Sequence, residues 1–367
     1  MPRLCTILAW LLSVASAATA VAQNGLDIGP GGGPARAPWY SPSGLCFQPL
    51  LYASPLETTY VTADLIAFRR DWQTPQVFAT LDTPTDIALS IGDLEIAYQP
   101  GLRVLAGRRM NEWFALEGSF LGLLQWDESR TRLDNTPNSQ GTTGNLFSPF
   151  SDFGDPAIVG FDFNDLASIR LKSQFNNAEL NLRQRLVTQP SLMQASALYG
   201  FRYMNIRETF NYRTASLAPI GPGTATAVET NTWNSLWGLQ AGGTLEFRIE
   251  PRFWLNFELK GILSYNDAAQ QTDFTAGPLA GPGVTISGSN DRGRITLSGD
   301  VSATAIWKFT PRIVGRAGYQ GIFIDGLALA ADNFHRNLQF MTSSPSELTR
   351  NSHLAFHGPF AGVTVTW

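Results

Sequence analysis

The residues of this sequence most suited to acid–base or metal chemistry are its three histidines, His335, His353 and His357. His353 and His357 are four residues apart, and on a helix both could bind one metal ion. The pattern around them predicts a strand, on which four residues span roughly 13 Å, whereas a metal–imidazole bond is about 2 Å long. We therefore expect no metal site and no catalytic residue, and we interpret the histidines as exposed loop side chains.

A second set of potential ligands is formed by the carboxylates between residues 125 and 166. Their oxygens could bind Ca²⁺, but their spacing fits no EF-hand loop, so we interpret the segment as a solvated loop. These carboxylates are Asp127, Glu128, Asp134, Asp152, Asp155, Asp162 and Asp165. The sequence also has no phosphate-binding loop, nucleophile elbow or paired-cysteine motif, and it predicts neither an enzyme nor a bound cofactor.

Charges that alternate with apolar residues are more informative. In FWLNFELKGILSY, residues 253–265, one face is apolar or aromatic apart from a glycine, and the other carries Glu258 and Lys260. The pattern recurs along the chain, and the charges on its polar face are Asp64, Arg103, Glu117, Glu179, Arg183, Arg202, Glu246, Arg248, Glu258, Lys260, Arg294, Asp300, Lys308 and Arg316. Both signs occur, which favours ion pairing in a confined interior, because unpaired buried charges are costly.

Strands must position these charges, because from Thr58 onward the hydrophobic period is two and no helical pattern is sustained. The predicted strands are 58–69, 95–109, 112–124, 167–186, 194–210, 232–248, 253–266, 292–309, 312–325 and 354–367. Each is long enough for a transmembrane strand, which needs about 9–11 residues. Periodicity alone leaves the orientation open, because soluble barrels turn the apolar face inward and membrane barrels turn it outward.

The connections between the predicted strands alternate in length. The long polar ones are 70–94, 125–166, 211–231, 267–291 and 326–353, and the others are tight turns. Outer-membrane barrels combine short periplasmic turns with long external loops in this way. The sequence therefore predicts a single antiparallel transmembrane β-barrel of about ten strands over residues 58–367, or twelve if residues 74–91 add a hairpin. Ten strands leave a narrow lumen, which we expect paired charges to fill, with at most a thin polar passage.

Aromatic residues gather near the predicted strand ends, as they do at the two interfaces of membrane barrels. The interface aromatics that we expect are Trp113, Trp237, Phe253, Tyr265, Trp307 and Trp367, together with Tyr60 and Trp254 beside the short turns.

Two local expectations concern the barrel wall. Within 167–186 the apolar parity changes at Asn176-Asn177, which predicts a β-bulge. On the strand 253–266, we expect Glu258 and Lys260 to pair with charges of neighbouring strands, such as Arg248 or Asp300.

The N-terminal segment predicts export. Arg3 precedes the short apolar run 4–14, and Ala20-Val21-Ala22 before Gln23 is a small-residue cleavage site. We divide the chain into a signal peptide, 1–22, a Gly/Pro-rich flexible leader, 23–57, and the barrel. Cleavage would leave Cys46 as the single thiol, so no internal disulfide is expected. The net charge of −4 gives no support to nucleic-acid binding.

The order of six stretches resembles a family of planctomycete outer-membrane proteins, the seventh of the β-barrel porin families. The stretches are GLRVLAGRRMNEWFALEGSFLGL (101–123), NAELNLRQRL (177–186), LYGFRYMNIRE (198–208), GLQAGGTLEFR (238–248), YQGIFIDGLALAADNF (319–334) and HGPFAGVTVTW (357–367). The resemblance covers most of residues 58–367 and implies a single outer-membrane β-barrel. It provides no catalytic residues to transfer.

Two functions remain open at this point. The first is a monomeric outer-membrane barrel, either a narrow porin-like channel or a structural and surface-display protein. Its expected partners are membrane lipid and the barrel-insertion machinery, and its solute is unknown. The second is a soluble exported barrel that holds a small apolar ligand inside.

Overall fold

The computed structural model describes residues 59–71, 75–158, 160–186, 192–216, 225–276, 285–343, 345 and 347–367. The predicted signal peptide, the leader and Cys46 lie outside these residues. Within the described part of the chain, no helix is both long and apolar enough to cross a membrane.

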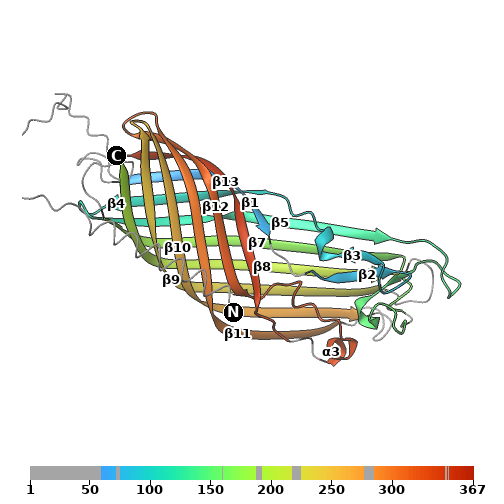
Figure 1. Ribbon diagram of the computed structural model, residues 1–367. Coiled ribbons are helices and arrows are strands. Elements are labelled where there is room, and N and C mark those ends of the chain that lie inside the picture. Colours follow the sequence, from blue (N-terminus) through green and yellow to red (C-terminus); the bar gives the residue numbers. More distant parts are fainter. Residues whose placement is uncertain are drawn as a thin grey trace, which may run out of the picture. The chain divides into compact units, whose positions relative to one another are not determined.

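Ten antiparallel strands close into one barrel in the order β1-β13-β12-β11-β10-β9-β8-β7-β5-β4 (Figure 1). They are β1 (Thr59–Asp71), β4 (Gln99–Arg109), β5 (Phe114–Leu133), β7 (Leu166–Arg185), β8 (Met193–Ala215), β9 (Ala225–Glu250), β10 (Phe253–Ala276), β11 (Thr285–Lys308), β12 (Ile313–Leu327) and β13 (Ser352–Thr366). Pairing of β1 with both β13 and β4 closes the wall, so every barrel strand has two neighbours. The predicted ten-strand antiparallel barrel is therefore confirmed.

The possible extra hairpin forms, but not in the barrel wall. Strands β2 (Val77–Leu81) and β3 (Ile87–Ser90) pair with each other, and β2 also pairs with β6 (Leu146–Phe147) in a separate sheet. The long connections also contain the short helices η2 (Ile91–Asp93), η3 (Pro149–Ser151) and α3 (Leu338–Ser343). The twelve-strand alternative is therefore wrong.

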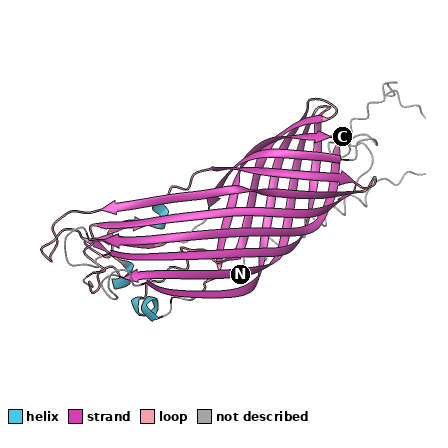
Figure 2. Ribbon diagram, turned by 180° about the vertical axis from the view of Figure 1, so that it is seen from behind, coloured by secondary structure: helices cyan, strands magenta, loops and turns pink. Residues whose placement is uncertain are grey.

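The barrel is much longer on one side than on the other. Strands β5 and β7 to β11 have 20–26 residues, whereas β1, β4, β12 and β13 have 11–15. Residues 285–297 of β11 have no partner on β12, and residues 123–133 of β5 have none on β4. We call the part of the wall on the short-turn side, up to the level of Tyr203, Trp237, Tyr265 and Ile295, the base. The parts of the six long strands that continue beyond it are the extension (Figure 2).

The extension corrects the predicted loops 211–231 and 267–291. There, β8 continues to Ala215, β9 begins at Ala225, β10 continues to Ala276 and β11 begins at Thr285. These segments look like loops in the sequence because their outward residues are polar. Their backbones remain in a continuous antiparallel ladder, which satisfies their N–H and C=O groups.

The sidedness of the wall inverts between base and extension most clearly on β7, whereas the inner face of β9 keeps the polar residues Thr226, Thr230, Thr232 and Asn234. In the base, Leu180 and Leu182 point outward while Glu179 and Arg183 point inward. In the extension the inward residues of β7 are Ala167, Ile169, Leu171 and Phe175, with Ser173 as the one polar member. The outward residues there are polar, namely Ser168, Arg170, Lys172, Gln174 and Asn176.

This inversion also explains why the predicted bulge at Asn176-Asn177 is wrong. Pairing of β7 with β8 is continuous through both residues, and the inner and outer faces keep strict alternation. The apolar residues change faces because the surroundings change, while the backbone register does not. The irregularity lies on the neighbouring strand β5, between Leu121 and Leu124, where Leu123 has a φ of 65°.

Candidate functional site: the filled lumen

Arg202 on β8 lies at the centre of the charged cluster in the base. Its side chain is 0% exposed, and Nη1 donates to Asp300 Oδ2 at 2.9 Å. Nε donates to Asn177 Oδ1 at 2.7 Å, and Glu179 Oε1 lies 3.7 Å from Nη2. The guanidinium is therefore held between carboxylates of β7 and β11.

The pair Glu258 and Lys260 on β10 joins this cluster. Lys260 Nζ is 2.9 Å from Glu258 Oε1, 3.1 Å from Glu179 Oε2 and 3.8 Å from Asp300 Oδ2. Glu258 Oε2 accepts a hydrogen bond from Arg183 Nη2 at 3.2 Å. Because Arg183 belongs to β7, this contact crosses the interior of the barrel.

Arg183 carries the chain of ion pairs on to β5. Its Nε and Nη2 donate to the two oxygens of Glu117 at 2.7 and 3.0 Å. Tyr60 donates its hydroxyl hydrogen to Glu117 and is buried inside the barrel. A Cβ at Gly107 would come within 2.2 Å of the Tyr60 ring, so the glycine makes room for it. The expected interface position of Tyr60 is therefore wrong.

A second cluster, on β1, β4 and β12, lies around Asp64. Arg103 donates from Nε to Asp64 Oδ2 at 2.7 Å and from Nη1 to Gln320 Oε1 at 2.6 Å. Arg316 Nε is 3.4 Å from Asp64 Oδ1. Both guanidinium groups lie over the Phe360 ring, 4.2 and 5.4 Å from its centroid. Gln320 also donates to the Arg202 cluster, so the two clusters are connected.

Little free volume remains between these side chains. The cavity bounded by both clusters has a volume of about 100 Å³. A water molecule needs at least ~10–15 Å³ of such space, so the cavity has room for about seven to ten waters at most.

Four of the predicted inward charges lie outside the connected clusters. Glu246 is buried and accepts from Asn256 at 3.0 Å, and Lys308 lies beside the short turn after β11. Arg248 stacks over the buried Trp254 ring at 5.9 Å, and Arg294 donates to a backbone carbonyl of the last long connection. The expected pairing of Arg248 with the β10 charges is wrong, as is the expected interface position of Trp254.

The predicted interface aromatics lie on the outer surface of the base. Phe253 and Trp307 pack together there, with ring centroids 5.8 Å apart. Their exposed companions are Trp113, Trp237, Tyr265 and Trp367.

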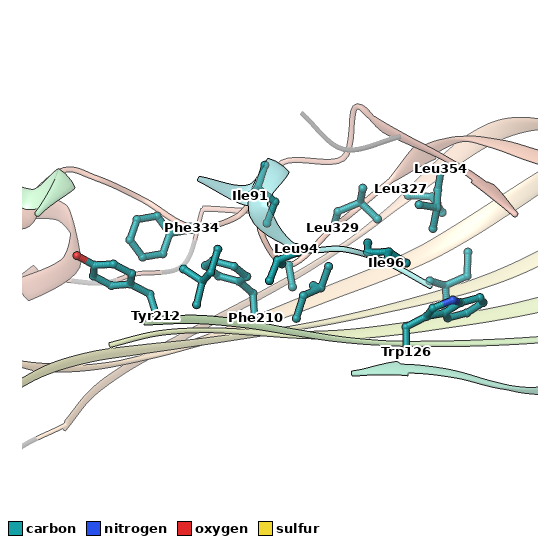
Figure 3. Close-up of a cluster of buried hydrophobic side chains, with 14 of the residues drawn as sticks. Ile91, Leu94, Ile96, Trp126, Phe210, Tyr212, Leu327, Leu329, Phe334 and Leu354 are labelled. Carbon is teal, nitrogen blue, oxygen red and sulfur yellow. The ribbon is translucent and has the colours of Figure 1, made fainter. Parts of the chain in front are cut away.

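The interior of the extension is filled by apolar side chains from the long connections. Phe78 of β2 packs against Phe210 of β8 at 4.7 Å, and Phe150 of η3 packs against Phe274 of β10 at 5.4 Å. Figure 3 shows Ile91, Leu94 and Ile96 lying against the inner face, with Phe210 and Tyr212 among their neighbours. We call the residues that β2, β3, β6, η2, η3 and their flanking segments contribute to this core the plug.

The segment 326–334, which begins with the last two residues of β12 and which we call the strap, crosses the same interior. Asn234 of β9 holds its backbone, accepting from Ala328 N at 2.9 Å and donating to Ala328 O at 2.8 Å. Asn266 of β10 donates to Gly326 O at 3.1 Å. Because these polar backbone groups are satisfied by inward amides, the strap can stay buried without a ladder of its own.

Sequence reasoning missed the buried ion pair that also holds the strap. Arg70 Nη2 is 2.7 Å from Glu208 Oε1, and Glu208 Oε2 accepts from Ala330 N at 3.2 Å. Glu208 follows Arg202 by six residues on the same strand, so the two share the inner face. This even spacing could have predicted that Glu208 points inward. Arg70 lies just beyond the predicted end of its strand.

Residues 57–367 match the family model described as "Putative beta barrel porin-7". The chain belongs to this family. That confirms the resemblance carried by the six sequence stretches. Among curated proteins, no match to the chain was found.

Solved outer-membrane barrels are distant neighbours of this porin-7 barrel. The outer membrane protease OmpT of Escherichia coli is 11% identical, with 86% of this chain and 98% of OmpT covered and a TM-score of 0.44. The translocator domain of autotransporter NalP from Neisseria meningitidis is 10% identical, with 84% and 88% covered and a TM-score of 0.37. The CymD monoaromatic hydrocarbon channel is 10% identical, with 85% and 89% covered and a TM-score of 0.32.

Two histidines of the porin-7 barrel, His353 and His357, lie on strand β13, so the expectation that they are loop side chains is wrong. His357 Nδ1 contacts the Tyr319 hydroxyl at 2.6 Å, and its Nε2 is 3.5 Å from Asp71 Oδ2. His335 lies in the last long connection, 3.9 Å from Glu347. Among the described residues, no group of His, Cys, Asp and Glu side chains has the arrangement of a metal site.

The acidic segment 125–166 is only partly the solvated loop that we expected. Asp162 is buried, and it accepts from the backbone N–H groups of Ser148 and Ile158 at 2.8 and 2.7 Å. Burial raises the pKa of Asp162, although these hydrogen bonds oppose the change. Asp127 is half-exposed, and the hydrogen bonds that it accepts from Arg170 lower its pKa.

Proposed function

We propose that this protein is an outer-membrane barrel with a closed lumen, which anchors an external extension and serves a structural or surface-display role. The inversion of sidedness between base and extension carries this proposal. An apolar outer face over charged inner residues suits lipid around the base. A polar outer face over an apolar core suits water around the extension.

The exposed apolar residues support lipid around the base. Leu65, Leu239 and Ile295 are 73%, 70% and 69% exposed on its outer face. In water each would leave most of a side chain unburied, a loss of roughly 1–2 kcal/mol per residue relative to burial. A soluble barrel with an apolar ligand inside would need these faces reversed, so we do not retain that alternative.

Two sets of side chains, one in the base and one in the extension, close the lumen. The charge clusters occupy the base, and the plug and the strap occupy the extension. Barrels with about eight strands have interiors filled by side chains, whereas those with 16–18 leave an aqueous channel. A barrel of ten strands is close to the filled limit. A solute would have to displace both layers to cross.

Two positions on one face of β10 test the membrane placement. Leu263 points outward in the base, and Gln271 points outward in the extension. In a Cys46→Ser background, a membrane-impermeant maleimide should label Gln271→Cys in intact cells. It should leave Leu263→Cys unlabelled until detergent is added. Equal labelling of both cysteines before detergent would remove the proposal.

The closed lumen is tested separately in planar bilayers. The reconstituted wild-type barrel should give no stable single-channel steps. Regular steps of one size from heat-modifiable, folded protein would instead favour the narrow channel.

A further inference from the structure

The outer face of the extension separates its charges by strand. Cations stand on β7 and β8, and acids stand on β9, β10 and β11. The exposed cations, which we call the basic stripe, are Arg170, Lys172, Arg207 and Arg213. The outward acids, which we call the acidic stripe, are Glu229, Asp267, Asp273 and Asp291.

Cross-strand pairing brings the cations of the basic stripe together. Lys172 pairs with Thr209, two residues from Arg207, and Ser168 pairs with Arg213, two residues from Arg170. Such diagonal neighbours are about 7–8 Å apart, within reach of long side chains. The four cations therefore form one continuous patch across two strands.

Most of this positive charge is not neutralised within the protein. Asp127 of β5 binds Arg170 at 2.6 Å and is 4.0 Å from Lys172. In the part of the chain that the structure describes, Arg207 and Arg213 form no ion pair. An open hollow of about 450 Å³ lies beside the stripe. Arg170, Lys172 and Arg213 line it together with one carboxylate, Glu229, and with hydroxyl, amide and apolar side chains.

The stripe starts at the rim of the apolar outer face of the base. Tyr203 and Trp237 pair across β8 and β9 with ring centroids 4.1 Å apart. Arg207 follows Tyr203 by four residues on the same face of β8 and pairs with Trp233. Four residues of a strand span roughly 13 Å, less along the membrane normal because barrel strands tilt by about 35–45°. If the aromatic pair marks the outer lipid interface, Arg207 stands near the lipid headgroups. The other cations lie further out, with Arg213 ten residues from Tyr203, roughly 33 Å along the strand.

We propose that the basic stripe binds the phosphate groups of an outer-leaflet glycolipid, with the sugar in the adjoining hollow. Arg offers planar, bidentate donors for phosphate, and Lys adds a point charge. The hydroxyl and amide side chains of the hollow are suitable partners for sugar hydroxyls. This inference rests on the proposed placement of the base in the outer membrane.

The test compares two triple variants in folded, detergent-solubilised protein. The stripe variant is Lys172→Gln/Arg207→Gln/Arg213→Gln. The matched control, on the other side of the same face, is Asp267→Asn/Asp273→Asn/Asp291→Asn. Heat-dependent gel mobility confirms that each variant is folded. The probes are a glycolipid that carries phosphates on its diglucosamine and on its inner sugars, the dephosphorylated form of this lipid, and inorganic phosphate. Bound lipid is counted by native mass spectrometry.

We expect the wild type and the acidic control to retain the phosphorylated lipid, and the stripe variant to bind it at least tenfold more weakly. Arg207, the cation nearest the surface, contributes about fivefold in affinity for anionic lipid. Lys172 and Arg213 need to add only about twofold through phosphates further from the membrane. Inorganic phosphate should not compete at millimolar concentration.

Three results would overturn the inference: equal binding of the two lipid forms, equal losses in the two triple variants, or competition by free phosphate. A fourth is a stripe variant that loses only self-association, because the stripe would then contact a second copy. Flotation of the wild type with phosphatidylcholine vesicles keeps the two proposals apart. Insertion into these vesicles without preference for phosphorylated lipid would leave the membrane barrel intact and remove only the lipid site.

Discussion

Replacing Arg202 with Met should destabilise the barrel strongly. The substitution removes the 2.9 Å contact with Asp300 and the 2.7 Å hydrogen bond to Asn177, both fully inside the base. After the substitution, the Glu179 carboxylate still has Lys260 Nζ at 3.1 Å, whereas the cation nearest to the Asp300 carboxylate is the same Lys260 at 3.8 Å. Removing one partner of a buried ion pair typically costs about 3–5 kcal/mol, because the remaining charge stays desolvated. We expect a loss in this range.

The measurement is equilibrium unfolding in urea from detergent micelles, followed by the fluorescence of the chain's ten tryptophans. A second variant, Arg202→Met/Asp300→Leu, removes both charges. It should recover part of the loss, giving a coupling free energy of roughly 0.5–3 kcal/mol between the two sites. A single-variant loss below about 1 kcal/mol, or strict additivity in the double variant, would show that the pair is solvated and that the lumen is not tightly filled.

Three further outcomes test other parts of the structure. Leu259→Arg places a cation on the lipid face, and it should lower the free energy of unfolding in refolding titrations by about 2–4 kcal/mol. Glu258→Gln should cost less, because the partners of Glu258 keep other carboxylates. The reverse order would mean that the barrel faces are assigned the wrong way round. Asn234→Ala leaves two backbone groups of the strap unsatisfied, so it should lower the free energy of unfolding by about 2–5 kcal/mol. It should also speed limited proteolysis of the strap. Unchanged proteolysis would show that Asn234 does not hold the strap in place. The hydrogen bonds from Arg170 lower the pKa of Asp127, so their stabilisation is present above pH 3.8 and is lost as the pH falls through the lowered pKa. The small difference in urea midpoint between wild type and Arg170→Gln should therefore disappear in acid, and a difference that grows in acid would refute the pairing.

Part of this structure was predictable because strand alternation is local information. In residues 253–265 apolar and polar residues alternate, so each residue indicates which face of the strand the next one occupies. The same alternation located the short-turn ends of all ten wall strands to within a few residues. The rule failed at the other end, where outward polar residues were mistaken for loops. Hydropathy depends on what surrounds a strand, and the surroundings change along β8 and β10 while the backbone does not.

The sequence by itself determined the barrel, its family and which charges share the inner face, and it left the number of strands at ten or twelve. Only the tertiary structure decided which of those charges meet. Arg202 and Asp300 are 98 residues apart in the chain, and they come together because closing ten strands sets one particular stagger across the lumen. The fate of the long connections was equally hidden, because the apolar residues of β2 and of the strap gain burial only from the inner face of the extension. The alternation of apolar and polar residues identifies each wall strand from neighbouring residues alone. The ion pairs and the core inside the barrel depend on contacts between strands and loops that are distant in sequence.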